Sequence, residues 1–215
     1  MLSRTIAAGL SSQAYRKAAC FLASLDEDWA QHIAEVGPCR HEAKPAREPY
    51  EALVRAIAYQ QLHARAGDAI LARLLALYPG TTFPSPELLL ATELQIQRAC
   101  GFSAAKLDTI RGIAQAAVDG IVPTRVEALS LSDDALIERL TSLRGVGRWT
   151  VEMLLIYTLE RPDILPADDF GVREGYRRLK GLDKAPTPRQ MRAISDSFSP
   201  WRTIASWYLW RIPTR

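Results

Sequence analysis

Two glycines and an arginine fall within four residues of the segment "LTSLRGVGRWTVEMLLIYTL", residues 140–159. Glycine permits a positive φ angle and lets another backbone or a ligand come close, because it has no Cβ. Gly145 and Gly147 separate two apolar segments with helical periodicity, so the N–H groups around Val146 can face outward at the start of the second helix. Such a helix start binds anions, and Arg148 adds a positive charge that suits a phosphate group. The glycines also fit an ordinary tight turn between two helices, and the residue types alone leave both interpretations open.

The composition is that of an ordinary globular protein. The chain has 215 residues, of which 48% are hydrophobic and 24% are charged, and this is enough to bury a full core in one domain or two small lobes. The net charge of +3 is compatible with a polyanionic partner but does not require one. The three cysteines, Cys20, Cys39 and Cys100, are odd in number and widely spaced, so they support neither a disulfide framework nor a metal cluster. The apolar run at the N-terminus is interrupted and too short to span a membrane.

Helical periodicity dominates the chain, and the alternation typical of strands is nearly absent, which predicts an all-α protein. Ser103 and Ser132 each precede an apolar-periodic segment and are good N-caps. The helix that follows Ser103 is expected to end near residue 120, at an aspartate and a glycine. A first helical region is expected over residues 15–34, with a break near Asp26.

The order of these elements predicts a single unit over residues 1–215 that can divide into two helical lobes. The polar, proline-bearing connector of residues 36–49 is the expected junction of the lobes. The hairpin and its flanking helices cover residues 133–159, and a loop over residues 160–170 leads into one further helix. A "KAPTP" spacer and a final segment rich in tryptophan complete the chain.

Three blocks, in the right order, resemble the helix-hairpin-helix DNA glycosylase superfamily, and specifically its alkylpurine branch of the DNA-3-methyladenine glycosylase II type. They are "YEALVRAIAYQQLHARAG" (50–67), "LRGVGRWT" (143–150) and "LPADDFGVREGYRRL" (165–179). The resemblance extends from residue 50 to about residue 210 and is more specific than the hairpin alone. It implies a two-lobed helical bundle of HhH-GPD type, in the compact form without an N-terminal β domain.

The resemblance assigns catalysis to Asp169. The family's catalytic aspartate directly precedes an aromatic or aliphatic residue and its helix, and Phe170 marks that position. Breaking an N-glycosidic bond leaves positive charge on the sugar, which a carboxylate beside C1′ stabilises. Asp168 is then expected to cap or orient the loop. Without the resemblance, capping is the simpler interpretation for either aspartate.

The residue after Arg148 bears on the type of reaction. Bifunctional members of the superfamily carry a lysine there, which attacks C1′ as an amine and goes on to cut the strand. Here the residue is Trp149, so the resemblance implies a monofunctional enzyme that leaves an intact abasic site. Trp149, Trp201 and Phe198 are expected to line the base pocket, because an indole face attracts a cationic purine. Three further aromatic residues at near-helical spacing are expected in the core: Trp207, Tyr208 and Trp210.

A base that enters such a pocket leaves a gap in the duplex, and something must fill it. The resemblance places Gln61 at the inserting position, with Leu62 and His63 beside it on the DNA. The rest of the expected DNA-binding set is the hairpin: Gly145, Val146, Gly147 and Arg148. The alternative is that Gln60 and Gln61 only end a helix and that His63 is solvated.

The family often holds a monovalent cation, Na⁺ or K⁺, on hairpin carbonyls, and Thr141, Leu143 and Val146 are the matching donors. No other cofactor is expected. The implied function is release of 3-methyladenine and 7-methylguanine from double-stranded DNA in base excision repair, by a monomer without a membrane partner. The implied location is the cytoplasm and nucleoid of a bacterium or the nucleus of a eukaryote. Two alternatives stay open: a non-catalytic helix-hairpin-helix DNA-binding module, and a glycosylase for another lesion such as hypoxanthine or ethenoadenine.

Overall fold

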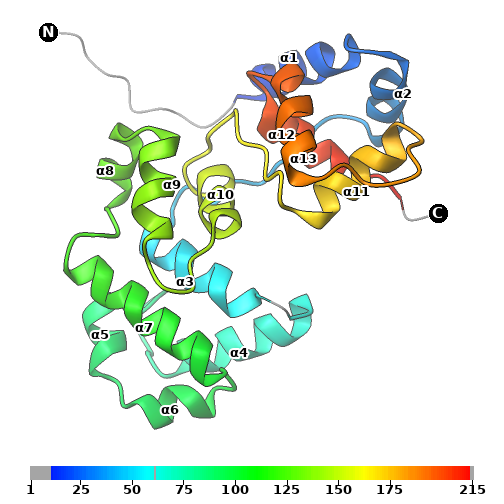
Figure 1. Ribbon diagram of the computed structural model, residues 1–215. Helices are drawn as coiled ribbons and strands as arrows, with labels where there is room; N and C mark the ends of the chain where they lie inside the picture. The colour runs from blue at the N-terminus through cyan, green and yellow to red at the C-terminus, as the bar shows by residue number, and fades with distance from the viewer. Residues whose placement is uncertain (1–10, 61, 214–215) are drawn as a thin grey trace, which may run out of the picture. The chain divides into compact units, whose positions relative to one another are not determined.

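The structure is a computed structural model that describes residues 11–60 and 62–213 (Figure 1). Within these residues every regular element is a helix, which confirms the all-α prediction. The chain divides into two compact units. We call residues 46–154 the middle unit, and the residues before and after it, up to Pro45 and from Leu155 onward, the terminal unit. No helix in the described part of the chain is both long and apolar enough to cross a membrane.

The middle unit runs from α3 to the hairpin that joins α9 and α10. Its helices are α3 (Pro49–Tyr59), α4 (Ala64–Ala76), α5 (Pro86–Ala91), α6 (Leu94–Ala99), α7 (Ala104–Val118), α8 (Arg125–Ser130), α9 (Asp133–Thr141) and α10 (Arg148–Tyr157), the last of which ends in the terminal unit.

Helix α7 organises the core of the middle unit. It packs against α3 and α5, which lie beside it in Figure 1. Ser103 caps its start by accepting the N–H of Lys106, as the sequence predicts. The apolar positions Leu107, Ile110 and Ile113 recur at helical spacing and are almost completely buried. This face of α7 therefore fixes the elements to which the hairpin is attached.

The terminal unit combines the N-terminal helices with those after the hairpin. Its helices are α1 (Ser12–Ala23), α2 (Glu27–Val36), α11 (Phe170–Leu179), α12 (Pro188–Ser195), the short 3₁₀ helix η1 (Asp196–Phe198) and α13 (Arg202–Leu209). Asp26 caps α2 through the N–H of Trp29, which confirms the expected break in the first helical region. Helix α13 packs against α1, α2 and α11.

Three buried aromatic residues define the core of the terminal unit. Trp29 meets the edge of Phe198, with ring centroids 5.3 Å apart, and Tyr208 is fully buried beside it in the same apolar cluster. His32 bonds the carbonyl oxygen of Tyr208 through Nε2 at 2.9 Å, which links α2 to α13. The prediction that Trp207 and Tyr208 serve the core is confirmed.

Candidate functional site

Asp169, the predicted catalytic residue, is the N-cap of α11. Its Oδ1 accepts the backbone N–H of Val172 at 2.8 Å. The prediction that Asp168 plays the capping role is therefore wrong: Asp168 is exposed and pairs with Arg192 at 3.1 Å. The two adjacent aspartates have equal intrinsic preference for a cap, and the start of α11 at Phe170 selects the second. Asp169 is half-buried at the end of the loop where the carboxylate is expected.

Trp210 is the second donor to this carboxylate. Its indole Nε1–H donates to Asp169 Oδ1 at 2.9 Å, and its ring stacks on Tyr157 with centroids 6.4 Å apart and planes 17° apart. Trp210 packs against the core, as predicted, and makes this bond in addition. The contact joins residues 41 positions apart, and no local pattern in the sequence signals it.

Gly171 leaves the space in which the bond between Trp210 and Asp169 forms. A Cβ at this position would lie 3.0 Å from Trp210 Cδ1 and 3.1 Å from Asp169 Oδ1. Both distances are tighter than ordinary van der Waals contact, so a side chain here would push on the indole and on the carboxylate together. The glycine after Phe170 thus serves the geometry of the site.

The loop before Asp169 is held by the start of α13. The hydroxyl of Thr203 donates to the carbonyl oxygen of Arg161 at 2.6 Å and accepts the N–H of Ile164 at 3.1 Å. Asp163 accepts the hydroxyl of Ser199 at 2.8 Å. These bonds join two segments of the terminal unit and fix the path of the chain toward Asp169.

The two aromatic residues predicted for the pocket within the terminal unit differ in their surroundings. Trp201 is half-buried at the N-cap position of α13 and packs against the edge of the core. Phe198 is only 2% exposed and is enclosed by Trp29 and Tyr176. Phe198 is therefore a core residue here, rather than the wall of a base pocket that we expected. For Trp201 the pocket role stays a prediction.

The structure gives different reasons for the presence of glycine at the two hairpin positions, 145 and 147. Gly145 has a φ of +82°, and a Cβ there would come within 2.9 Å of Thr109 Cγ2, so both the turn and its packing on α7 require glycine. Gly147 has no atom within 4 Å of the position of a Cβ. Among the described residues, no neighbouring atom therefore demands a glycine at position 147. Its missing side chain leaves the exposed start of α10 accessible to a close partner.

The first turn of α10 carries Arg148 and Trp149. Arg148 donates from Nε to Glu152 Oε1 at 2.9 Å, one turn along the helix. The Glu152 side chain is only 3% exposed while that of Arg148 is 47% exposed, so a buried carboxylate orients a largely exposed guanidinium. Trp149 is 36% exposed, and Val146 is buried under the turn.

The segment between α3 and α4 carries Gln61, the residue predicted to insert into DNA, and its neighbours Leu62 and His63, which are predicted to lie beside it on the DNA. Gln61 lies outside the described residues. Leu62 is 39% exposed, and His63 is the exposed N-cap residue of α4, without a capping bond from its side chain. Gln60 follows the last residue of α3, as the alternative interpretation expects, and its Nε2 donates to Thr150 Oγ1 at 3.2 Å. This bond joins the segment to α10, next to Trp149.

The carbonyl donors predicted for a monovalent cation extend from the last residue of α9, Thr141, into the hairpin turn at Leu143 and Val146. Thr141 is the last residue of α9, and the carbonyl oxygen of Leu143 accepts the N–H of Val146 at 3.1 Å. A helix C-terminus carries partial negative charge on its carbonyl groups. Neutral oxygen donors of this kind fit a hard monovalent cation, and the ion itself stays a prediction.

A basic run over residues 172–181 follows Asp169, and by sequence it fits a solvated helix face. Arg177 and Arg178 both bind Glu174 within α11. The hydrogen bonds from Arg177 lower the pKa of Glu174 to about 2. Lys180 bridges Asp26 and Asp28 of the neighbouring helix. These pairings account for Arg177, Arg178 and Lys180 within the fold.

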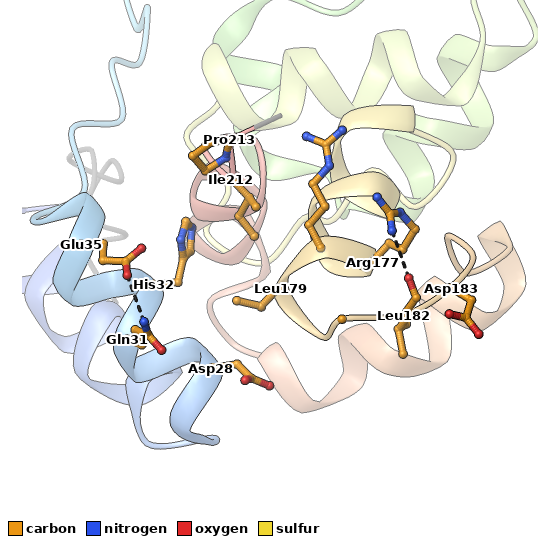
Figure 2. Close-up of a pocket in the computed structure, with 12 residues that line it drawn as sticks. Asp28, Gln31, His32, Glu35, Arg177, Leu179, Leu182, Asp183, Ile212 and Pro213 are labelled. Atoms are coloured by element: carbon orange, nitrogen blue, oxygen red, sulfur yellow. Dashed lines mark hydrogen bonds between the residues drawn. The ribbon is translucent and has the colours of Figure 1, made fainter. Parts of the chain in front are cut away.

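A cavity of about 670 Å³ opens in the terminal unit at the far end of α11 from Asp169. Figure 2 shows His32 and Asp28 of α2 on one side of it, with Leu179 and the bond from Arg177 to the Leu182 carbonyl oxygen on the other. Neither Asp169 nor Trp210 lines this cavity. It is therefore separate from the carboxylate site.

Two helices joined by a glycine turn, followed by a helix capped by an aspartate, define a helix-hairpin-helix protein of the kind that binds DNA. Comparisons with known proteins agree with this class. Residues 54–200 match the family described as HhH-GPD superfamily base excision DNA repair protein. The match covers most of the chain, including both the hairpin and Asp169, and the chain belongs to this superfamily.

Individual proteins of this kind are similar to the chain over most of its length. The chain is 47% identical over 196 residues to DNA-3-methyladenine glycosylase 1 of Schizosaccharomyces pombe, covering 91% of this chain and 86% of that protein. A solved structure of the Schizosaccharomyces pombe 3-methyladenine DNA glycosylase in complex with abasic DNA matches with a TM-score of 0.83, over 91% of this chain and 95% of that one. A DNA-3-methyladenine glycosidase from Bacillus halodurans is 28% identical with a TM-score of 0.78, over 90% and 88% of the two chains.

Proposed function

We propose that this protein is an alkylpurine DNA glycosylase of base excision repair that hydrolyses the N-glycosidic bond of 3-methyladenine and 7-methylguanine. Supporting this, relatives that cover most of the chain are named as 3-methyladenine glycosylases. The observation that carries the proposal is the orientation of Asp169, which accepts N–H groups from Val172 and Trp210 on one oxygen.

The chemistry of the proposed reaction needs a fixed carboxylate. As the bond between sugar and base breaks, C1′ gains positive charge, and a negative group held beside it stabilises that charge more than it stabilises the ground state. A methylated purine carries a positive charge of its own and leaves readily, so the reaction does not require a strong general acid. Asp169 is the residue proposed to oppose the charge and to help orient the attacking water.

Trp149 makes the proposed reaction monofunctional. An indole cannot attack C1′ as an amine, so no Schiff base forms at this position and the strand is not cut. Methylated duplex DNA treated with the protein is expected to stay intact on a denaturing gel and to break only after alkali. Strand breaks that appear without alkali would contradict this assignment. An unmethylated duplex of the same sequence is the control.

We propose that the hairpin holds the DNA backbone without reading the base sequence. The open space at Gly147 and the oriented guanidinium of Arg148 suit a phosphate at the start of α10. Gln61 is proposed to enter the duplex, with Leu62 and His63 beside it on the DNA. Trp149 and Trp201 are proposed to hold the extruded base, and the carbonyl groups of the hairpin to hold Na⁺ or K⁺ when the ion is bound. The protein is proposed to act as a monomer.

Replacing Trp210 by phenylalanine is expected to lower the rate of base release by about 10- to 150-fold, because a hydrogen bond to a charged group contributes about 1.5–3 kcal/mol. The phenyl ring keeps an aromatic surface against Tyr157 but cannot donate to Asp169. Single-turnover assays on methylated duplex DNA measure the effect. We expect a DNA dissociation constant within about 3-fold of the wild-type value, because this variant leaves the phosphate contacts in place. An unchanged rate would show that Trp210 does not orient the carboxylate.

A further inference from the structure

The end of α3 depends on a lysine from another helix. Gln60, the residue after α3, has φ −52° and ψ 130°, so the chain leaves the helix abruptly there. The last carbonyl groups of a helix have no partner within the helix. Lys106 of α7 provides a hydrogen-bond donor for two of these carbonyl groups. Its Nζ donates to the carbonyl oxygen of Ala58 at 3.0 Å and to that of Gln60 at 2.6 Å.

Lys106 lies at a position where burial of its ammonium group costs free energy unless the group is hydrogen-bonded. The residue is half-buried, and burial lowers the pKa of its ammonium group. A cation at the C-terminal end of a helix also interacts favourably with the helix dipole. The ammonium group therefore binds the backbone of the segment instead of extending into solvent, as most lysines do.

Gln60 is held a second time through its side chain. Its Nε2 donates to the hydroxyl of Thr150, which is only 1% exposed in the first turn of α10. The carbonyl group of Gln60 is thus fixed by α7 and its amide group by α10. The residue before Gln60 adds a bond to α4, because the hydroxyl of Tyr59 donates to Asp68.

We propose that Lys106 is a positioning residue for base extrusion, acting together with Thr150 through Gln60. The inference rests on the proposed function. By holding the end of α3 on α7 and α10, these contacts keep Leu62 and His63 at a fixed place relative to the hairpin. A side chain that fills the gap in a duplex opposes restacking only if its backbone does not yield, and extrusion costs a few kcal/mol.

Two duplexes that differ in the base opposite the lesion distinguish a role in base extrusion from a general effect on folding, because a folding defect would slow release from both equally. Lys106→Met keeps the length of the side chain and removes the three donors. On a duplex with 7-methylguanine opposite cytosine, the single-turnover rate of release is expected to fall by about 10-fold, the factor that corresponds to ~1.4 kcal/mol. With the same lesion opposite an abasic site, where less pairing must be broken, the rate is expected to fall by less than about 3-fold.

A second readout does not depend on catalysis. With 2-aminopurine next to a tetrahydrofuran abasic analogue in a duplex, saturating wild-type protein is expected to raise the fluorescence by unstacking the site. Lys106→Met and Gln60→Met are expected to give a smaller increase at saturation, with dissociation constants by anisotropy within about 3-fold of wild type. Lys184→Met, which alters an exposed lysine of the terminal unit, is the matched control and should match wild type in both assays.

Equal rate losses on the two duplexes, or full fluorescence at saturation for Lys106→Met, would overturn the positioning role. A wild-type protein that releases no base from either duplex would overturn the proposed function instead. In that case the fluorescence assay alone would still decide whether Lys106 controls the insertion of the segment.

Discussion

Asp169→Asn is expected to lower the single-turnover rate of base release by about 10²- to 10³-fold, the range seen when one electrostatic contact to a transition state is removed. The substitution removes a charge and little else. Asparagine caps helices as well as aspartate does, and its side-chain oxygen can still accept the N–H groups of Val172 and Trp210. The variant should therefore fold and bind duplex DNA normally, and only the charge that opposes the cationic sugar is lost.

The neighbouring carboxylate is the matched control for this substitution. Asp168→Asn removes the same charge one residue earlier, from an exposed side chain paired with Arg192. Exposed ion pairs contribute little to stability, so this variant is expected to keep a release rate within about 3-fold of wild type. Full activity in Asp169→Asn, or a collapse of activity in Asp168→Asn, would show that the wrong aspartate has been assigned.

Gly175→Ala is expected to destabilise the protein by about 3 kcal/mol, at the upper end of the usual cost of overpacking a core. Gly175 is buried in α11 against the backbone of α13. An added Cβ would overlap the carbonyl oxygen of Leu209 and lie 2.9 Å from the carbonyl carbon of the same residue. Because these atoms belong to the backbone of a helix, they cannot rotate away. For a chain of this size the change corresponds to a fall in Tm of roughly 6–12 °C in calorimetry.

A glycine in open space supplies the comparison for Gly175. Gly112 lies on the exposed side of α7, and no atom lies within 4 Å of its Cβ position. Gly112→Ala is expected to leave Tm unchanged or raise it slightly, since alanine is favoured over glycine in a helix by up to about 1 kcal/mol. A Gly175→Ala protein as stable as Gly112→Ala would mean that α11 and α13 do not approach each other as closely as described.

Local signals in the sequence predict most of the helices. Ser103 and Ser132 cap α7 and α9 as expected, and Asp26 caps α2 at the predicted break. Helix α7 ends at Val118, and the predicted aspartate, Asp119, is its C-cap. These features depend on residues within one turn of each other, so the chain carries them without help from distant contacts.

Helices α8 and α12 are absent from the predicted elements although the sequence carries their signal. Helices α8 and α12 each begin with a capping box, from Thr124 to Glu127 and from Thr187 to Gln190. This pattern of threonine and a glutamate or glutamine three residues later marks a helix start. Both helices are short, and prolines lie close to the start of each one. Composition alone therefore favours a loop at these positions.

The details of the site depend on contacts that sequence patterns do not contain. Adjacent aspartates are equal candidates for a cap, and only the packing of α11 decides between Asp168 and Asp169. Trp210 contacts Asp169 across 41 residues, and Lys106 reaches Gln60 across 46. In each case two helices far apart in the chain must pack before the polar groups meet.

The most direct test of the account is mass spectrometry of the bases that the purified protein releases from duplex DNA. The panel carries 3-methyladenine, 7-methylguanine, hypoxanthine or ethenoadenine, and Asp169→Asn is assayed beside the wild type. We expect the wild type to release 3-methyladenine and 7-methylguanine, and the variant to release almost none. Strong, salt-sensitive binding without release of any base would identify a non-catalytic DNA-binding protein and contradict the account, and release of hypoxanthine or ethenoadenine alone would contradict its assignment to alkylated purines.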